Sequence, residues 1–379
     1  MNATPPLAIL YLHLTQGCNL ACRHCWLNPP FDPEARRQPV LPFEAVRQAI
    51  DEARPLGLQG LKLTGGEPLL HPRLADIVAL AARKELSLVV ETNGTLVDDA
   101  IAEARRRHGR ASVAVSLDSA RPDVHDAFRG VEGAFAKSVA GVRRLAAAGL
   151  KPQVIASLIP ENRHELEALV RLAETLGAES FKLNIVQPTT RGQRLHRRGA
   201  SVPLPEILAA CRELAADIAP RSRLRIYPDL PYAFRSLQAL HRNGGGRCAV
   251  KNILAVLATE HYALCGIGTS RKELVFGAVG AHSLRTIWET HPVLAAIRSQ
   301  LPERLTGVCG QCLMKRVCLG SCLAQNFYRG GSLFGPFWFC EQAARLGLFP
   351  ASRLAPRPAR ATAPPPARSA NATTMRNHP

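Results

Sequence analysis

The sequence predicts an α/β fold, in which a partial barrel of about six parallel β/α units is followed by a small cysteine-rich domain. Between residues 8 and 200, short apolar stretches of strand length alternate with longer stretches of helical periodicity. This alternation is typical of parallel sheets with helical crossovers. Seven of the eleven cysteines follow, between residues 248 and 340, which indicates a separate metal-binding region.

The predicted elements come in regular order, and their ends carry polar residues. Strands are expected at residues 8–14, 60–64, 87–91, 112–117, 152–158 and 180–184, and helices at 43–56, 72–84, 96–107, 134–148 and 161–176. In such barrels the carboxyl ends of the strands share one face, where active sites lie. Five polar residues fall at these ends, and they predict an enzyme: Cys18, Glu67, Asn93, Asp118 and Asn184.

The bulk composition argues against several classes of protein. A net charge of +18 invites an acidic partner, but aromatic residues make up only 5% of the chain, too few to stack on many bases. Nucleic-acid binding is therefore not expected. No apolar run reaches the roughly 20 residues of a membrane span. Because the N-terminus lacks a secretory signal, the eleven cysteines indicate metal ligation in a reducing cytoplasm.

The first cysteine motif is Cys18-x3-Cys22-x2-Cys25, directly after the first expected strand. Three thiols on one loop can hold a [4Fe–4S] cluster in which one iron has no protein ligand, since full cysteine ligation takes four thiolates. A zinc ion with His24 or a distant residue as its fourth ligand is the alternative. The spacing alone leaves both open.

The other strand ends have two readings each. Gly65 and Gly66 let a ligand approach the backbone, and Glu67 can accept hydrogen bonds from an ammonium group. The same Gly-Gly-Glu-Pro stretch can equally be a tight turn, as can the stretch around Asn93. Asp118 can be the N-cap of a following helix. These residues follow successive strands and lie on the same face of the predicted barrel, and together they indicate an active site.

Together, the cysteine loop, Gly65-Gly66-Glu67-Pro68 and Ser116-Leu117-Asp118 resemble the radical SAM superfamily. The resemblance implies a partial TIM barrel in which Cys18, Cys22 and Cys25 hold a [4Fe–4S] cluster whose open iron binds S-adenosyl-L-methionine. His24 occupies the position at which the family usually has an aromatic residue. The implied cofactor-binding residues are Gly65, Gly66, Glu67, Asn93, Ser116, Asp118 and Arg129. For Arg129, a surface position is an equal alternative.

The second cysteine array resembles the SPASM extension of radical SAM enzymes. The resemblance implies two auxiliary iron–sulfur clusters, one held by Cys309, Cys312, Cys318 and Cys340, the other by Cys248, Cys265 and Cys322. Glu260 replaces a glycine of the family pattern. The second set lacks a fourth cysteine, so its last iron is open to substrate, water or a non-cysteine ligand. A zinc ribbon is the alternative, although seven thiols exceed one site.

The expected domain boundaries follow from these motifs. The barrel covers residues 8–200, linker helices 201–245 and the auxiliary-cluster domain 246–345. Residues 351–379 form a basic, Pro/Ala-rich tail whose composition predicts disorder. The four arginines between 187 and 198 are read as a solvated loop or as a steering surface for an acidic peptide. Cys211 is expected in the core.

The resemblance implies reductive cleavage of S-adenosyl-L-methionine to a 5′-deoxyadenosyl radical and oxidative modification of a ribosomally made peptide, through a thioether or carbon–carbon crosslink. The alternatives are formylglycine formation as in sulfatase maturases, haem or quinone cofactor biosynthesis, and, from another class, a non-catalytic zinc or iron–sulfur binding protein. No catalytic general base is identified.

The expected partners are a precursor peptide or protein and a reductant such as flavodoxin or ferredoxin. Because the first expected strand starts at residue 8, the chain leaves no room for an N-terminal leader-binding domain. A separate leader-recognition protein is therefore expected as well.

Overall fold

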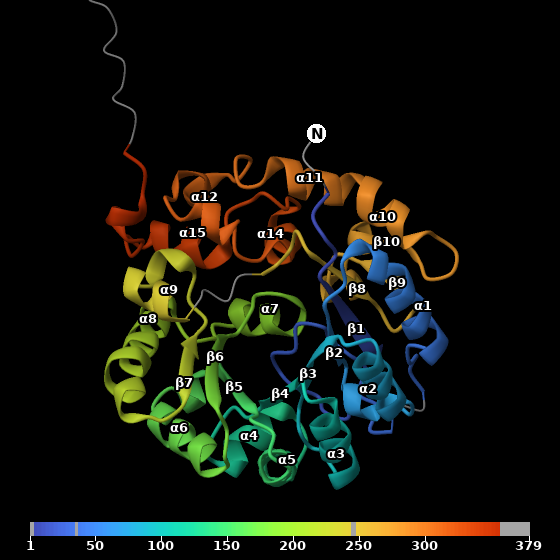
Figure 1. Cartoon of the computed structure of the whole chain (residues 1–379). Coiled ribbons are helices and arrows are strands. Elements are labelled where there is room, and N and C mark those ends of the chain that lie inside the picture. The colour runs from blue at the N-terminus through green and yellow to red at the C-terminus, as the bar shows by residue number, and fades with distance from the viewer. Residues whose placement is uncertain (1–3, 35–36, 244–247, 357–379) are drawn as a thin grey trace, which may run out of the picture.

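One continuous sheet organises the molecule. The computed structural model describes residues 4–34, 37–243 and 248–356. Within them the sheet has ten strands in the order β10-β9-β8-β1-β2-β3-β4-β5-β6-β7 (Figure 1). Its strands are β1 (Ile9–Thr15), β2 (Gly60–Gly65), β3 (Ser87–Thr92), β4 (Ala111–Ser116), β5 (Gln153–Leu158), β6 (Ser180–Ile185), β7 (Arg225–Pro228), β8 (Ile253–Val256), β9 (His261–Ala263) and β10 (Val275–Ala278).

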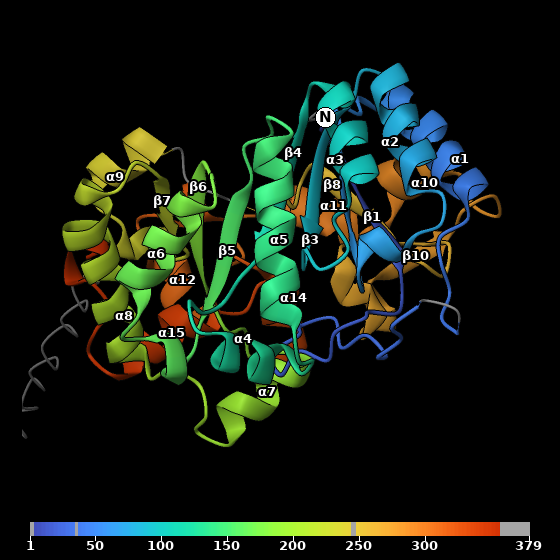
Figure 2. The ribbon, with the colours of Figure 1, turned by 90° about the horizontal axis from the view of Figure 1, so that it is seen from below.

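Strands β1 to β7 are parallel, and helices cover their outer side (Figures 1 and 2). In β1, Leu10 and Leu12 are fully buried toward the helices, while the alternate residues face the other side of the sheet. The helices of this half are α1 (Phe43–Ala53), α2 (Leu74–Arg83), α3 (Asp99–His108), α4 (Pro122–Arg129), α5 (Ala134–Ala147), α6 (Leu166–Thr175), α7 (Thr190–Arg197), α8 (Leu204–Glu213) and α9 (Leu237–Asn243).

Helix α1 illustrates why these segments are helical. Its buried residues Val46, Ala49 and Ile50 recur at the spacing of one helix face. They pack in the same apolar core as β1. The predicted α/β partial barrel is confirmed, and each of the six predicted strands lies within two residues of its expected bounds.

The cysteine-rich half extends the same sheet. Strand β8 pairs in parallel with β1, Tyr11 opposite Ala255, and β9 and β10 continue as antiparallel strands. Figure 1 shows this half in orange and red along one side of the barrel. Its helices are α10 (Leu284–Thr290), α11 (Pro292–Gln300), α12 (Gly307–Gln311), α13 (Lys315–Cys318), α14 (Leu323–Gly330) and α15 (Trp338–Arg345).

Several details differ from the expectations. The stretch expected as linker helices also contains β7, which pairs with β6. The arginine stretch forms α7 rather than a loop. At the C-terminus, residues 351–353 form a 3₁₀ turn, and Ala355 N donates to Gln311 O at 2.9 Å, so the first residues of the expected tail are packed. The rest of that tail, residues 357–379, lies outside the described residues.

Cys211 is buried in the main core as expected. Across the described ranges, no helix has the length and apolar character needed to cross a membrane.

Candidate active site

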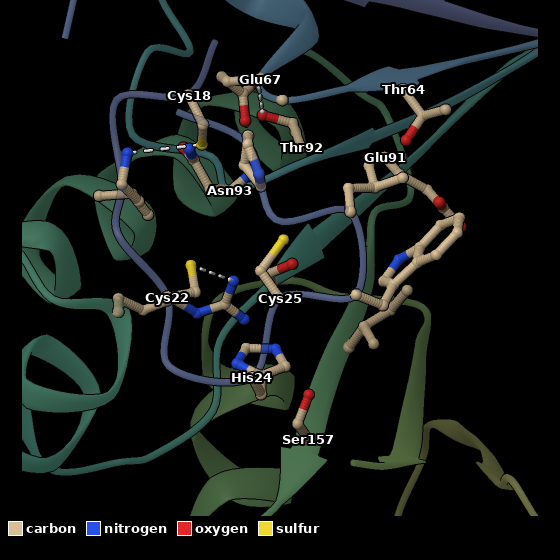
Figure 3. A pocket seen from close by; sticks show the side chains of 18 of the residues that line it. Cys18, Cys22, His24, Cys25, Thr64, Glu67, Glu91, Thr92, Asn93 and Ser157 are labelled. Atoms are coloured by element: carbon tan, nitrogen blue, oxygen red, sulfur yellow. Dashed lines mark hydrogen bonds between the residues drawn. The ribbon is translucent and has the colours of Figure 1, made fainter. Parts of the chain in front are cut away.

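The three cysteines of the first motif line one cavity at the carboxyl ends of the barrel strands. Cys18 and Cys22 are buried and Cys25 is half-buried, and Figure 3 shows their sulfur atoms around a common space. The cavity has a volume of about 200 Å³. Six of the predicted cofactor-binding residues share its lining: Gly65, Gly66, Glu67, Asn93, Ser116 and Arg129.

The glycine pair allows the cysteine loop to lie against the end of β2. Gly65 has φ +132, and a Cβ on Gly66 would lie 1.7 Å from the carbonyl oxygen of Gly17. Glu67 N donates to that same Gly17 oxygen at 3.1 Å. The sequence predicted that a ligand would approach the backbone at Gly65 and Gly66. In the structure the cysteine loop makes this close approach at Gly66.

The carboxylate of Glu67 joins the ends of two strands. It is 1% exposed and accepts hydrogen bonds from Leu69 N at 3.0 Å and Asn93 N at 2.8 Å. It also accepts one from Thr92 Oγ1 at 2.7 Å (Figure 3). A carboxylate has about four acceptor positions, so most are already used by the protein. Glu67 thus fixes the turn after β2 against the turn after β3.

Asn93 connects β3 to the cysteine loop. Its Nδ2 donates to Asn19 Oδ1 at 2.8 Å, and its Oδ1 accepts from Thr95 N at 2.9 Å. Asn19 in turn donates to Thr95 Oγ1 at 2.8 Å. The stretch around Asn93 is therefore both a turn and a support for the residues between Cys18 and Cys22.

Asp118 lies beneath the cavity and does not line it. Its fully buried carboxylate accepts from Arg129 Nε at 2.5 Å and from Ser157 N at 2.8 Å. Burial is the largest single effect and opposes ionisation, but the charges of Arg129, His24 and His125 and the hydrogen bond from Arg129 together hold the pKa of Asp118 below its ordinary value. Arg129 is 7% exposed, so its surface alternative is wrong. Its Nη1 donates to Cys22 Sγ at 3.6 Å.

His24 lines the cavity, and its ring is held in place by Phe128. Its ring stacks on Phe128 with centroids 4.3 Å apart and planes 8° apart. Burial, followed by the charge of Arg129, lowers the pKa of His24 from 6.5 to about 4, so the ring is neutral near pH 7.

Arg191 of α7 forms hydrogen bonds with the cysteine loop and the residues that follow it. Its guanidinium donates to Cys22 O at 3.2 Å, Pro29 O at 2.6 Å and Asn28 Oδ1 at 2.8 Å. Arg194, Arg197 and Arg198 are exposed. One arginine of the run is thus structural, and the others remain available on the surface.

The second cysteine array forms two groups. Cys309 and Cys340 share a hydrogen bond, and Cys318 is an electrostatic neighbour of both Cys309 and Cys312. Cys265, in turn, is an electrostatic neighbour of Cys322 and Cys248. Burial raises the pKa of Cys318 in the first group and of Cys265 in the second. Metal coordination is the ordinary way to hold such thiols as thiolates.

A second cavity, of about 170 Å³, lies beside the first. It is lined by Cys248, Cys322 and Asp229, and Gln187 lines both cavities. The first cysteine motif and the group that contains Cys248 and Cys322 therefore line adjoining cavities.

Sequence reasoning missed several residues of the first cavity, among them Glu91, Ser157 and Gln187. It also missed His13, which is 2% exposed with both ring nitrogens unpartnered, beside a further cavity that shares Gly65 and Gly66. His13 and Tyr11 lie on the face of β1 opposite Leu10 and Leu12. The alternation of side chains along a strand could have predicted this position from the sequence. Asn184, placed correctly at a strand end, lines the first cavity with an unpartnered Oδ1.

Comparisons with known proteins agree with this architecture. The model of the Radical SAM superfamily matches residues 12–173. The AdoMet-dependent heme synthase of Methanosarcina barkeri is 29% identical over 339 residues, 86% of this chain and 94% of its own. Mycofactocin maturase MftC of Mycobacterium ulcerans is 28% identical over 344 residues, 87% of this chain and 86% of its own.

Among solved structures, Streptococcus suis SuiB bound to precursor peptide SuiA has the same fold, with a TM-score of 0.71 at 16% identity, over 89% of this chain and 76% of SuiB. The sequence match, the fold and the placement of the three cysteines after β1 agree. The chain is an enzyme that carries a radical SAM domain at residues 12–173.

Proposed function

We propose that the chain is a peptide maturase that forms a thioether or carbon–carbon crosslink in a ribosomally made peptide, using one S-adenosyl-L-methionine-binding [4Fe–4S] cluster and two auxiliary clusters. One observation carries the proposal. The cavity lined by Cys18, Cys22 and Cys25 adjoins the cavity lined by Cys248 and Cys322, with Gln187 common to both. A substrate at Gln187 has access to both cysteine groups.

The first three cysteines suit a cluster better than a zinc ion. All three lie within residues 12–173, the part of the chain that matches the radical SAM superfamily. Zinc needs its sulfurs about 2.3 Å from a single point. The thiolates of an iron–sulfur cluster bind separate irons, so their sulfurs stand further apart. We therefore assign Cys18, Cys22 and Cys25 to a [4Fe–4S] cluster.

When bound and reduced, that cluster supplies the electron that cleaves S-adenosyl-L-methionine to methionine and a 5′-deoxyadenosyl radical. The chain itself binds and shields the reactants. Ser116 offers its hydroxyl group to the cofactor, Gly65 and Gly66 line the same cavity, and Arg129 donates to Cys22 Sγ at 3.6 Å. Ala114, Ile155 and Val186 make the adjoining wall apolar, which excludes water from a reactive site.

The auxiliary groups account for a net oxidation. Thioether formation replaces one C–H and one S–H bond by a C–S bond, so two electrons and two protons leave the peptide. A hydrogen atom goes to the 5′-deoxyadenosyl radical, and one further electron and proton must be removed. Cys248, Cys265 and Cys322 would hold an auxiliary cluster near the shared Gln187, and such a cluster would supply an acceptor for this electron.

The test is anaerobic purification, iron and sulfide counting, and incubation with dithionite and S-adenosyl-L-methionine while 5′-deoxyadenosine is measured. A Cys18→Ala, Cys22→Ala, Cys25→Ala triple variant should lose about one cluster of iron and all cleavage. Cys211→Ala, a buried cysteine of the core, is the matched control and should keep both. Zinc in place of iron, or cleavage by the triple variant, would overturn the proposal.

A second candidate function is haem synthesis. It is favoured by the similarity to AdoMet-dependent heme synthase over 94% of that protein's length, which includes the cysteine-rich half. The two functions separate by mass spectrometry and absorption. A peptide encoded by a neighbouring gene should lose about 2 mass units per crosslink, whereas a haem synthase should leave it unchanged and convert a porphyrin precursor to haem.

The proposal includes the partners and the compartment. The proposed compartment is the cytoplasm, where reducing conditions keep cysteines available for metal binding. A flavodoxin or ferredoxin is the proposed reductant, and a separate protein is proposed to recognise the peptide leader. Capture of the precursor peptide by the enzyme alone, at the affinity reached with all cellular partners present, would contradict the last point.

A further inference from the structure

The cysteine group of Cys248, Cys265 and Cys322 has three thiols for a cluster with four irons. We propose that Asp229 is the fourth protein ligand of this auxiliary cluster. The inference rests on the cluster assignment made under the proposed function. It adds a ligand of a different chemical class, a carboxylate, at a corner where the cysteine pattern ends.

Asp229 reaches this place because of the extra parallel strand β7. It follows Pro228, the last residue of β7, and its backbone N donates to Leu183 O of β6 at 2.9 Å. The strand end therefore fixes its position at the same edge of the barrel as the other site residues. There Asp229 lines the second cavity together with Cys248 and Cys322.

Asp229 shares the second cavity with Cys248 and Cys322, and Arg235 is the cation that lines the cavity with them. Within the described ranges, none of the ion pairs uses Asp229. The nearby Arg235 instead donates to Leu230 O at 2.7 Å and lies over the Tyr232 ring, 5.3 Å from its centroid.

The other polar residues of the cavity are less suited to ligate iron. Gln325 Oε1 accepts from Trp338 Nε1 at 2.9 Å. Cys318 also lines the cavity, but its sulfur is a neighbour of Cys309 and Cys312 in the other group. No other carboxylate and no histidine is among the described residues that line this cavity. Asp229 is thus the remaining anionic donor, and carboxylates bind iron in many protein sites.

The assignment predicts that this cluster has no exposed iron. An iron without a protein ligand is the one that mild oxidation removes, which converts [4Fe–4S] to [3Fe–4S]. In the wild type only the first cluster has such an iron, so ferricyanide treatment should give about one [3Fe–4S] centre per chain by electron paramagnetic resonance spin counting. Asp229→Ala and the near-isosteric Asp229→Asn should each give about two.

Two matched variants complete the test. Asp229→Cys restores a protein ligand and should return the count to about one, with a lower reduction potential because a thiolate donates more electron density. Asp217→Ala removes an exposed carboxylate of the same region and should also stay at about one. A count near two in the wild type, or near one in both Asp229→Ala and Asp229→Asn, would overturn the inference.

These outcomes are distinct from failure of the proposed function. If the wild type binds no iron at the auxiliary cysteines, the cluster assignment itself fails. If the iron content and S-adenosyl-L-methionine cleavage are as proposed while Asp229 variants keep the wild-type count, only the ligand assignment is wrong.

Discussion

Asp118 and Arg129 form a buried ion pair at the edge of the candidate active-site cavity, which Arg129 lines, with Nε and Oδ2 2.5 Å apart. The same guanidinium reaches Cys22 Sγ, so the pair ties the end of β4 to the cysteine loop. Asp118 therefore acts on the site through Arg129 and not by direct contact with a cofactor.

Removal of one partner should be costly because a buried charge loses its counter-ion. Asp118→Asn is expected to lower the free energy of unfolding by about 3–5 kcal/mol, measured by urea denaturation under anaerobic conditions. The exposed pair of Arg121 and Asp123 provides the control, and Asp123→Asn should leave the free energy of unfolding nearly unchanged. Equal losses in the two variants would show that the buried pair has no special role.

The pH dependence of stability should depend on His125, whose Nδ1 accepts from Asp118 N at 3.2 Å. Burial, the largest effect, lowers its pKa from 6.5 to about 4. In the unfolded chain His125 binds a proton near pH 6.5, whereas in the folded chain it stays neutral until the pH approaches 4. This contribution to stability is complete above pH 6.5 and is lost progressively as the pH falls toward 4.

His125→Asn keeps an acceptor for Asp118 N and removes the titration. Between pH 7.5 and 5.5 the wild type should lose about 1.4 kcal/mol more than this variant in free energy of unfolding. His164→Asn, at an exposed position, should follow the wild type. Parallel curves for His125→Asn and the wild type would refute the assignment.

The sequence predicted the residues whose position follows from a strand end alone. Gly65, Glu67, Asn93 and Ser116 lie where the alternation of strands and helices placed them, because carboxyl ends of parallel strands share one face. Asp118 was placed by the same rule but turns beneath the cavity, since its carboxylate finds Arg129 and Ser157 N. Such a partner depends on tertiary packing that spacing does not encode.

The pairing of distant strands was also beyond the sequence pattern. The strand β8 joins β1 across more than two hundred residues, and short strands such as β7 carry little periodic signal. Helix α7 was hidden because charged residues dominate it, and only Gly192 and Leu195 are buried. The role of Arg191 then follows from where α7 packs, not from the arginine content.

Gly66 should not tolerate any side chain. In Gly66→Ala the new Cβ would meet Gly17 O at 1.7 Å, so the cysteine loop must move away from the end of β2. We expect loss of about one cluster of iron per chain together with S-adenosyl-L-methionine cleavage, while the auxiliary clusters remain. Gly330→Ala, in a helix with no atom within 4 Å of the new Cβ, should keep full iron content. Full cleavage by Gly66→Ala would disprove the close approach.

Arg191 should control how long the first cluster survives. Its guanidinium holds the carbonyl groups of Cys22 and Pro29 from helix α7, so Arg191→Met frees the loop and exposes the cluster to solvent. Each lost hydrogen bond to a charged group contributes about 1.5–3 kcal/mol, and we expect at least a tenfold faster loss of the first cluster's visible absorbance in air. Arg194→Met, on an exposed position of the same helix, removes an equal charge and should decay at the wild-type rate. If the two variants decay alike, the arginines act only through charge, and α7 does not fasten the loop.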